Sequence, residues 1–119
     1  MLPKENRLSS SFDFQRIRRL GRRGESPFFS FFVLREYDRI RPPRFGFVVS
    51  AKVSKRATKR NRIRRVLQDE VGRALPRIQP GVSGVFWMKA RALQSDPQEL
   101  RAQVRKVLQK AGVLPGRME

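Results

Sequence analysis

Three apolar segments of strand length constrain the fold of this 119-residue chain more than any other feature. They are FFSFFVLREY (28–37), RFGFVVSA (44–51) and GVSGVFWMKA (81–90). Their aromatic and β-branched residues favour extended backbone, and the Gly, Pro and Asp residues between them favour turns. The sequence therefore predicts a small sheet built from short strands.

Three further segments carry helix signals. The first is SSFDFQRIRRLG (10–21), in which a serine can cap the start and the final glycine can close the end. The second has an apolar stripe over residues 63–75 and ends near Pro76. The third opens with the capping pattern DPQE (96–99) and ends before Gly112. The order α, β, β, α, β, α predicts an α+β fold, a two-layer α-β sandwich with helices on a small sheet.

The charge balance indicates the class of partner. The chain has 28 Lys and Arg against 10 Asp and Glu, a formal net charge of +18, which favours polyanions as binding partners. With 39% hydrophobic residues and nine Phe it is too apolar for a charged disordered tail, so one domain over residues 1–119 is expected. The start MLPKENRLSS lacks the apolar core of a secretion signal, and FFSFFVL is far shorter than the roughly 20 residues of a membrane span. A cytoplasmic protein without membrane contact is expected.

Few residues are suited to catalysis. The chain has no Cys and no His, which excludes disulfides, the usual zinc sites, thiol nucleophiles and imidazole bases. A protein nuclease acting alone would need convergent carboxylates to hold metal ions. The acidic residues are scattered, and the adjacent Asp69 and Glu70 are expected to point apart as solvated helix residues. No metal-binding motif is recognisable, so binding is expected rather than catalysis.

One stretch concentrates the positive charge. AKVSKRATKRNRIRR (51–65) has no acidic residue and contains Lys52, Lys55, Arg56, Lys59, Arg60, Arg62, Arg64 and Arg65. A solvated helix face is the simplest interpretation of such a run. However, each cation near a helix N-terminus costs about 0.3 to 1 kcal/mol, and at about 100° per residue these charges surround the helix start. We therefore expect a nucleic-acid interface there, although the spacing does not separate RNA from DNA.

The segment RFGFVVSAKVSKRATKRNRIRR (44–65) resembles the signature of the bacterial ribonuclease P protein component. That signature is an apolar strand with Gly, a Val-Ser/Ala-x-Lys turn, and an Arg-Asn-Arg box followed by x-Lys/Arg-Arg. The matching residues are Gly46, Val49, Ser50, Lys52, Arg60, Asn61, Arg62, Arg64 and Arg65. DFQRIRRLG (13–21) resembles the first helix of the family, and the length and element order match from end to end.

The resemblance implies a fold and a division of labour. It implies a four-stranded sheet with three helices, a short strand near residues 23–26, and a left-handed β-α-β crossover, against the usual right-handed preference. It also implies a subunit of the ribonuclease P ribonucleoprotein, an endonuclease that removes the 5′ leader of precursor tRNA. The ribonuclease P RNA would perform the hydrolysis with magnesium, and no obligate protein partner is expected.

The resemblance also assigns two binding sites. The residues expected to meet the catalytic RNA are Lys52, Lys55, Arg56, Lys59, Arg60, Asn61, Arg62, Arg64 and Arg65. Phe14, Arg18 and Phe32 would line a cleft that holds the single-stranded leader, where stacking adds about 1 to 3 kcal/mol per base. Packing in the core is the alternative for both Phe residues. Arg18 replaces an apolar or aromatic residue common in the family, and Lys89 interrupts the last strand and leaves its register open.

Two other functions are consistent with the charge. A ribosomal-protein-like module that only stabilises folded RNA has the same size and charge, and added affinity for a single-stranded leader would separate the two. A protein that binds anionic membranes fits less well. The apolar stripe at residues 63–75 is needed for the core, which leaves the basic helix no exposed apolar face.

Overall fold

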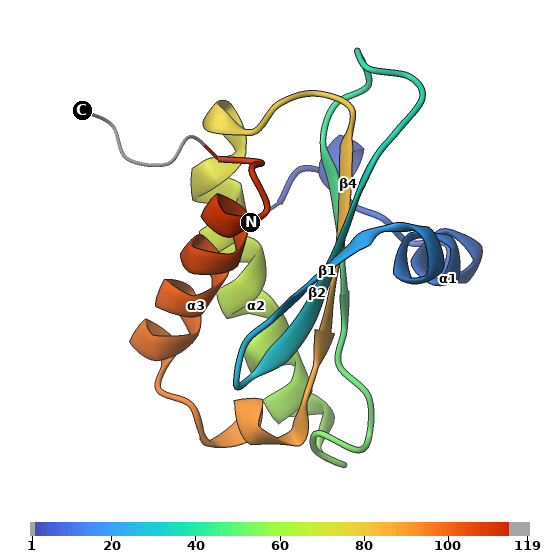
Figure 1. The fold of residues 1–119 in the computed structure, drawn as a ribbon. Helices are drawn as coiled ribbons and strands as arrows, with labels where there is room; N and C mark the ends of the chain where they lie inside the picture. The colour runs from blue at the N-terminus through green and yellow to red at the C-terminus, as the bar shows by residue number, and fades with distance from the viewer. Residues whose placement is uncertain (1, 115–119) are drawn as a thin grey trace.

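A four-stranded mixed sheet lies at the centre of the computed structural model, which describes residues 2–114 (Figure 1). The strands are β1 (Arg22–Glu25), β2 (Phe29–Arg35), β3 (Arg44–Val48) and β4 (Val82–Met88), arranged in the order β1-β2-β4-β3. β2 is antiparallel to both β1 and β4, whereas β3 and β4 are parallel. The predicted α+β class is confirmed, and β1 lies where a short additional strand was expected.

Three α-helices accompany the sheet in the described part of the chain: α1 (Ser11–Leu20), α2 (Ala57–Ala74) and α3 (Pro97–Lys110). The capping residues act as their sequences predict. The Ser10 hydroxyl accepts a hydrogen bond from the Asp13 backbone N–H at 3.4 Å, and Asp96 and Glu99 form a capping box. α2 joins the parallel strands β3 and β4, as a β-α-β unit requires, while the hand of this crossover stays a prediction.

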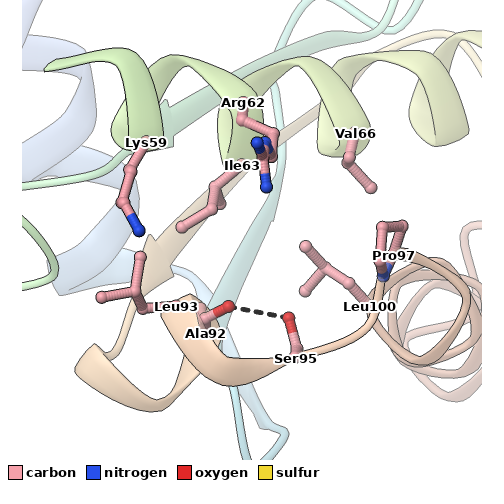
Figure 2. A pocket seen from close by; sticks show the side chains of 9 residues that line it. All are labelled: Lys59, Arg62, Ile63, Val66, Ala92, Leu93, Ser95, Pro97 and Leu100. Atoms are coloured by element: carbon pink, nitrogen blue, oxygen red, sulfur yellow. Dashed lines mark hydrogen bonds between the residues drawn. The ribbon is translucent and has the colours of Figure 1, made fainter. Parts of the chain in front are cut away.

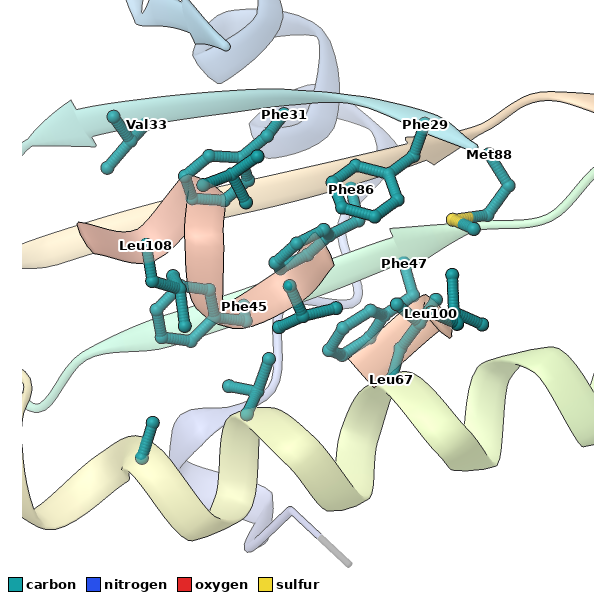
Figure 3. Packing of buried hydrophobic residues seen from close by; sticks show 14 of the residues in the cluster. Phe29, Phe31, Val33, Phe45, Phe47, Leu67, Phe86, Met88, Leu100 and Leu108 are labelled. Carbon is teal, nitrogen blue, oxygen red and sulfur yellow. The ribbon is translucent and has the colours of Figure 1, made fainter. Parts of the chain in front are cut away.

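The two faces of the sheet are covered unequally. α2 and α3 lie side by side on one face, and α1 lies on the other (Figure 1). The larger core fills the space between the sheet and the α2–α3 pair. Phe86 of β4 lies at its centre, with the ring centroids of Phe29, Phe31, Phe45 and Phe47 at 5.2, 4.6, 6.4 and 5.5 Å (Figure 3). Each such aromatic pair stabilises the fold by about 0.5 to 1.5 kcal/mol in addition to the contribution of its buried area.

Lys89 ends β4 instead of interrupting it. Its backbone N–H donates to the Phe28 carbonyl at 2.9 Å, and its ammonium lies 2.9 Å from a Glu25 carboxylate oxygen. The register that the sequence left open is therefore fixed: Val82 pairs with Arg35 and Met88 with Phe29. The lysine ties the end of β4 to the turn between β1 and β2.

The expectation that Asp69 and Glu70 are solvated and point apart was wrong. Glu70 is only 5% exposed, and one guanidinium nitrogen of Arg101 lies 2.6 Å from Asp69 and 3.3 Å from Glu70. Arg105 adds a 2.9 Å hydrogen bond to Glu70. The hydrogen bond from Arg101 holds the pKa of Asp69 below its ordinary value. Because α3 brings these arginines against α2, the carboxylates link the two helices.

Candidate nucleic-acid interface

The predicted interface gathers on one end of α2. We call Lys52, Lys55, Arg56, Lys59, Arg60, Asn61, Arg62, Arg64 and Arg65 the basic surface; it covers the loop before α2 and the first turns of the helix. α2 begins at the end of the sheet where β4 ends (Figure 1). All nine side chains are exposed except Arg60 and Arg64, which are half-buried. The residues that the sequence assigned to an interface therefore lie at the surface of the folded protein.

Local hydrogen bonds order the loop that carries the first of these cations. The hydroxyl of Ser54 accepts from the Arg56 backbone N–H at 3.1 Å, and the Arg60 guanidinium donates to the Ser54 carbonyl at 2.8 Å. Val53 is buried and anchors the loop to the core. Arg60 therefore braces the loop against the helix. Arg64 donates to the Asn61 amide oxygen at 2.7 Å, which orients that side chain as well.

The charge of the basic surface is not neutralised within the fold. Among residues 2–114, none of its eight cations forms an ion pair with a carboxylate. The N-terminus of α2 adds a partial positive charge, and no acidic residue lies in its first turn. Uncompensated charge of one sign at a helix start attracts polyanions and accelerates their association.

The second predicted site lies on the opposite face of the sheet, beneath α1. Phe14 is half-buried, and its ring lies on Gly46 so closely that a Cβ built there would be 2.3 Å from its Cε1. Phe32 is only 6% exposed, which favours packing over stacking for this residue. Arg18 is exposed and its guanidinium lies 4.7 Å from the centroid of the Trp87 ring.

Trp87 is a member of this face that the sequence prediction missed. It is half-buried, and its ring meets the edge of Phe32 at a centroid distance of 6.5 Å. Arg23, which pairs with Phe32 across β1 and β2, has its guanidinium 5.6 Å from the centroid of the Phe32 ring. The signal was present in β4, where alternation places Trp87 on the face of Val85 and opposite Phe86. We call Phe14, Phe32, Trp87, Arg18 and Arg23 the aromatic face.

An ion pair holds α1 against the sheet. The Arg16 guanidinium donates to both carboxylate oxygens of Glu36, at 3.1 and 2.9 Å. Glu36 is 8% exposed, and the hydrogen bonds from Arg16 hold its pKa below the ordinary value. The same carboxylate raises the pKa of Arg16. Because Arg16 lies between Phe14 and Arg18 on α1, this pair fixes the helix that carries both.

The two sites are rich in cations and aromatic rings and poor in groups that hold metal ions. Residues 2–114 contain no group of three or more His, Cys, Asp or Glu placed to hold a metal ion. Within the same residues, no helix is both long and apolar enough to cross a membrane. The arrangement is suited to binding: cations at a helix start for phosphates, and rings with neighbouring guanidinium groups for bases.

An α+β fold with an unpaired basic helix start and an aromatic face is typical of a nucleic-acid-binding protein. Comparison with known proteins then gives the family: the protein-family model described as Ribonuclease P matches residues 2–112. The chain belongs to the ribonuclease P protein family. It acts in tRNA 5′ processing, with the ribonuclease P RNA as partner, within a complex that has ribonuclease activity.

Curated relatives agree with this assignment, and solved structures agree with the fold. The chain is 35% identical to the ribonuclease P protein component of Cyanothece sp., with 98% of this chain and 99% of the relative covered. It is 33% identical to that of Rippkaea orientalis, with 97% and 93% covered. The structure of the Staphylococcus aureus protein superimposes with a TM-score of 0.84 at 23% identity, covering 93% of this chain and 99% of that one. The structure of the Thermotoga maritima protein, solved with 1-(4-fluorophenyl)-2-thiourea, superimposes with a TM-score of 0.75 at 22% identity, covering 94% of this chain and 99% of that one. Both structural similarities are evidence of the fold alone.

Proposed function

We propose that the basic surface binds the catalytic RNA, that the aromatic face binds the single-stranded 5′ leader of precursor tRNA, and that the RNA performs the hydrolysis. The observation that carries this proposal is the set of eight cations around the start of α2 without a carboxylate partner in residues 2–114. A fold that leaves so many charges unpaired gains from a polyanionic partner, because binding releases the counterions condensed on the RNA.

The members of the basic surface have different roles in this proposal. Arg62 and Arg65 are exposed and form no hydrogen bond to another residue of the described chain, so their planar forks are available for phosphates. Arg60 is half-buried and holds Ser54, so it shapes the loop as well as adding charge. Asn61 offers a donor and an acceptor, which suits a specific RNA feature.

The aromatic face suits a single strand for a different reason. Phe14 and Trp87 are both half-buried, so part of each ring is accessible while the rest is fixed by packing. Arg18 lies on Trp87 and carries a charge that can reach a phosphate. Stacking depends little on base identity, which suits a protein that meets many leaders. A ribosomal-protein-like role, confined to folded RNA, would leave this face without a ligand.

The composition of the chain supports this division of labour between RNA and protein. Magnesium would be held by the RNA and the phosphates, since the described residues have no carboxylate cluster for it. Precursor tRNA is the substrate in this proposal and the cytoplasm is the compartment, because tRNA and its processing RNA meet there.

The RNA-binding half is tested by measuring affinity for a bacterial ribonuclease P RNA as a function of salt. Arg62→Ala and Arg65→Ala should each weaken binding and lower the slope of log K against log salt by about 0.7 to 0.9, since one phosphate contact is lost. Arg77→Ala removes the same charge from the exposed end beyond α2, at η2 (Leu75–Arg77), and should change neither. Equal effects for all three variants would exclude the basic surface as the interface.

The leader-binding half is tested in the assembled ribonucleoprotein. Phe14→Ala should weaken binding of precursor tRNA by about tenfold, within the range for one lost stacking contact, and leave the affinity for mature tRNA unchanged. Circular dichroism and thermal unfolding of the variant show whether the fold is intact. An equal loss for both ligands in a folded variant would favour the ribosomal-protein-like role.

A further inference from the structure

A pocket of about 80 Å³ lies between α2 and the segment that precedes α3 (Figure 2). α2 provides Lys59, Arg62, Ile63 and Val66, and the opposite wall includes Leu93 of the short helix η3 (Ala90–Gln94) and Pro97 at the start of α3. The two walls are about 30 residues apart in the sequence and meet because α3 packs against α2. Two members of the basic surface therefore border a hollow whose other lining side chains are mostly apolar.

The floor and the rim of this pocket differ in chemistry. Ile63 is buried and Val66 half-buried, whereas Leu93 is 39% exposed, among the most exposed large apolar side chains of residues 2–114. The one hydroxyl in the wall, that of Ser95, already donates to the Ala92 carbonyl at 2.7 Å. The floor therefore offers an apolar surface with few free hydrogen-bonding groups.

The rim consists of two cations that have no partner in the described chain. Within residues 2–114, neither Lys59 nor Arg62 forms a side-chain hydrogen bond or an ion pair. Figure 2 shows both side chains directed from α2 toward the η3 segment that carries Leu93. A ligand that fits must combine a compact apolar part with a negative charge directly beside it.

We propose that this pocket receives one unstacked nucleotide of the RNA partner. Its base lies against Leu93, Val66 and Pro97, and its phosphate lies between Lys59 and Arg62. This inference rests on the proposed role of the basic surface and adds to it a shape-dependent contact. Phosphate contacts position a protein on RNA, whereas RNA-specific recognition uses bases that are splayed out of a helix.

Other occupants fit the pocket less well. A partner helix needs a groove long enough for side chains spaced over several turns, which this short hollow does not provide. The rim repels cationic peptides. A second, more open hollow shares Arg62 and Val66 with the pocket and includes Arg65, so the flanking RNA backbone has a further cation beside the pocket. Asp69 lines the same hollow and is paired with Arg101. Because the floor has few free polar groups, we expect the pocket to accept different bases.

The test is RNA affinity of the Leu93→Ala variant, measured over a range of salt with a bacterial ribonuclease P RNA. We expect affinity to fall about tenfold, because the base would lose the apolar surface of Leu93, with an unchanged salt slope because Leu93 carries no charge. Ile40→Ala is the matched control: Ile40 is 86% exposed in the loop between β2 and β3, away from α2, and its removal should have no effect. Thermal unfolding verifies that both variants fold.

The outcomes separate this inference from the proposed function. If Arg65→Ala loses affinity and slope while Leu93→Ala binds like the unchanged protein, the basic surface stands and the pocket proposal is wrong. If Arg65→Ala also binds normally, the interface itself is wrong and the pocket loses its basis. A lower slope of log K against log salt in Leu93→Ala would also contradict the pocket proposal, because it would show that the charged contacts had rearranged.

A direct probe uses the free protein with small ligands. Adenosine and cytidine monophosphates should both shift the methyl NMR signals of Leu93 and Val66, while inorganic phosphate at the same concentration should not. Equal shifts with inorganic phosphate would show an anion site without a base contact. A dimer in size-exclusion chromatography that Leu93→Ala abolishes would instead identify a second copy of the chain as the occupant, and would overturn the proposal.

Discussion

Replacing Gly46 by alanine should destabilise the fold through a single neighbour, Phe14. A Cβ built at Gly46 lies 2.3, 2.9 and 3.1 Å from the Cε1, Cζ and Cδ1 atoms of Phe14, and these are its three nearest atoms. The ring would have to move by roughly 1 Å to restore ordinary contact. Gly46 has no positive φ, so its backbone itself accepts alanine.

The magnitude follows from two opposing contributions. Overpacking costs about 1 to 3 kcal/mol, and the middle of that range applies because the half-buried ring can yield partly. Alanine is otherwise favoured over glycine in a strand by about 0.5 to 1 kcal/mol. Gly46→Ala should therefore lower the free energy of unfolding by about 1 to 1.5 kcal/mol in the presence of Phe14.

A double-mutant cycle isolates this contact. In a Phe14→Ala background, Gly46→Ala should stabilise the protein slightly, so the coupling energy between the two sites is about 2 kcal/mol. Urea unfolding of the four proteins measures it. If Gly46→Ala costs the same in both backgrounds, the close contact with Phe14 is not the cause, and the placement of α1 on β3 is wrong.

Three further substitutions test the polar contacts. Arg16 lowers the pKa of Glu36 in the folded state, so this pair stabilises the fold above the ordinary glutamate pKa, and the stabilisation is lost as the pH falls below about 4. Urea unfolding at a series of pH values should accordingly show a weaker acid dependence for Glu36→Gln. Glu70→Gln should lower the free energy of unfolding by about 1.5 to 3 kcal/mol, because it disrupts buried hydrogen bonds to arginine, and a normal melting temperature would contradict that role. Lys89→Met should cost less than about 1 kcal/mol, and added salt should abolish the difference, because its ion pair with Glu25 is solvent-exposed.

The sequence predicted the elements that bury an apolar face. β2, β3 and β4 are apolar over strand length, and α2 and α3 carry stripes at helical spacing, because these faces must meet in one core. β1 has no such pattern, since RRGE is charged apart from its glycine. Backbone hydrogen bonds to β2 hold this edge strand, so only the family resemblance indicated its position.

The basic surface was predictable because its cations are contiguous in the sequence and no acidic residue interrupts them. The aromatic face was predictable only in part: the family resemblance indicated Phe14, Arg18 and Phe32, but not Trp87. The three rings come from α1, β2 and β4 and meet only in the folded sheet. The partner of Glu70 was hidden for the same reason, because Arg101 is 31 residues away along the chain.

The most direct test of the central claim is cleavage of precursor tRNA by a bacterial ribonuclease P RNA at low magnesium, with and without this protein, together with the protein alone. We expect that efficient cleavage at the correct 5′ site requires both components and that the protein alone cleaves nothing. Binding of the RNA without any stimulation of cleavage would contradict a role in cleavage and favour a module that only stabilises folded RNA. Cleavage by the protein alone would contradict the proposed function more deeply, because the hydrolysis would then belong to the protein.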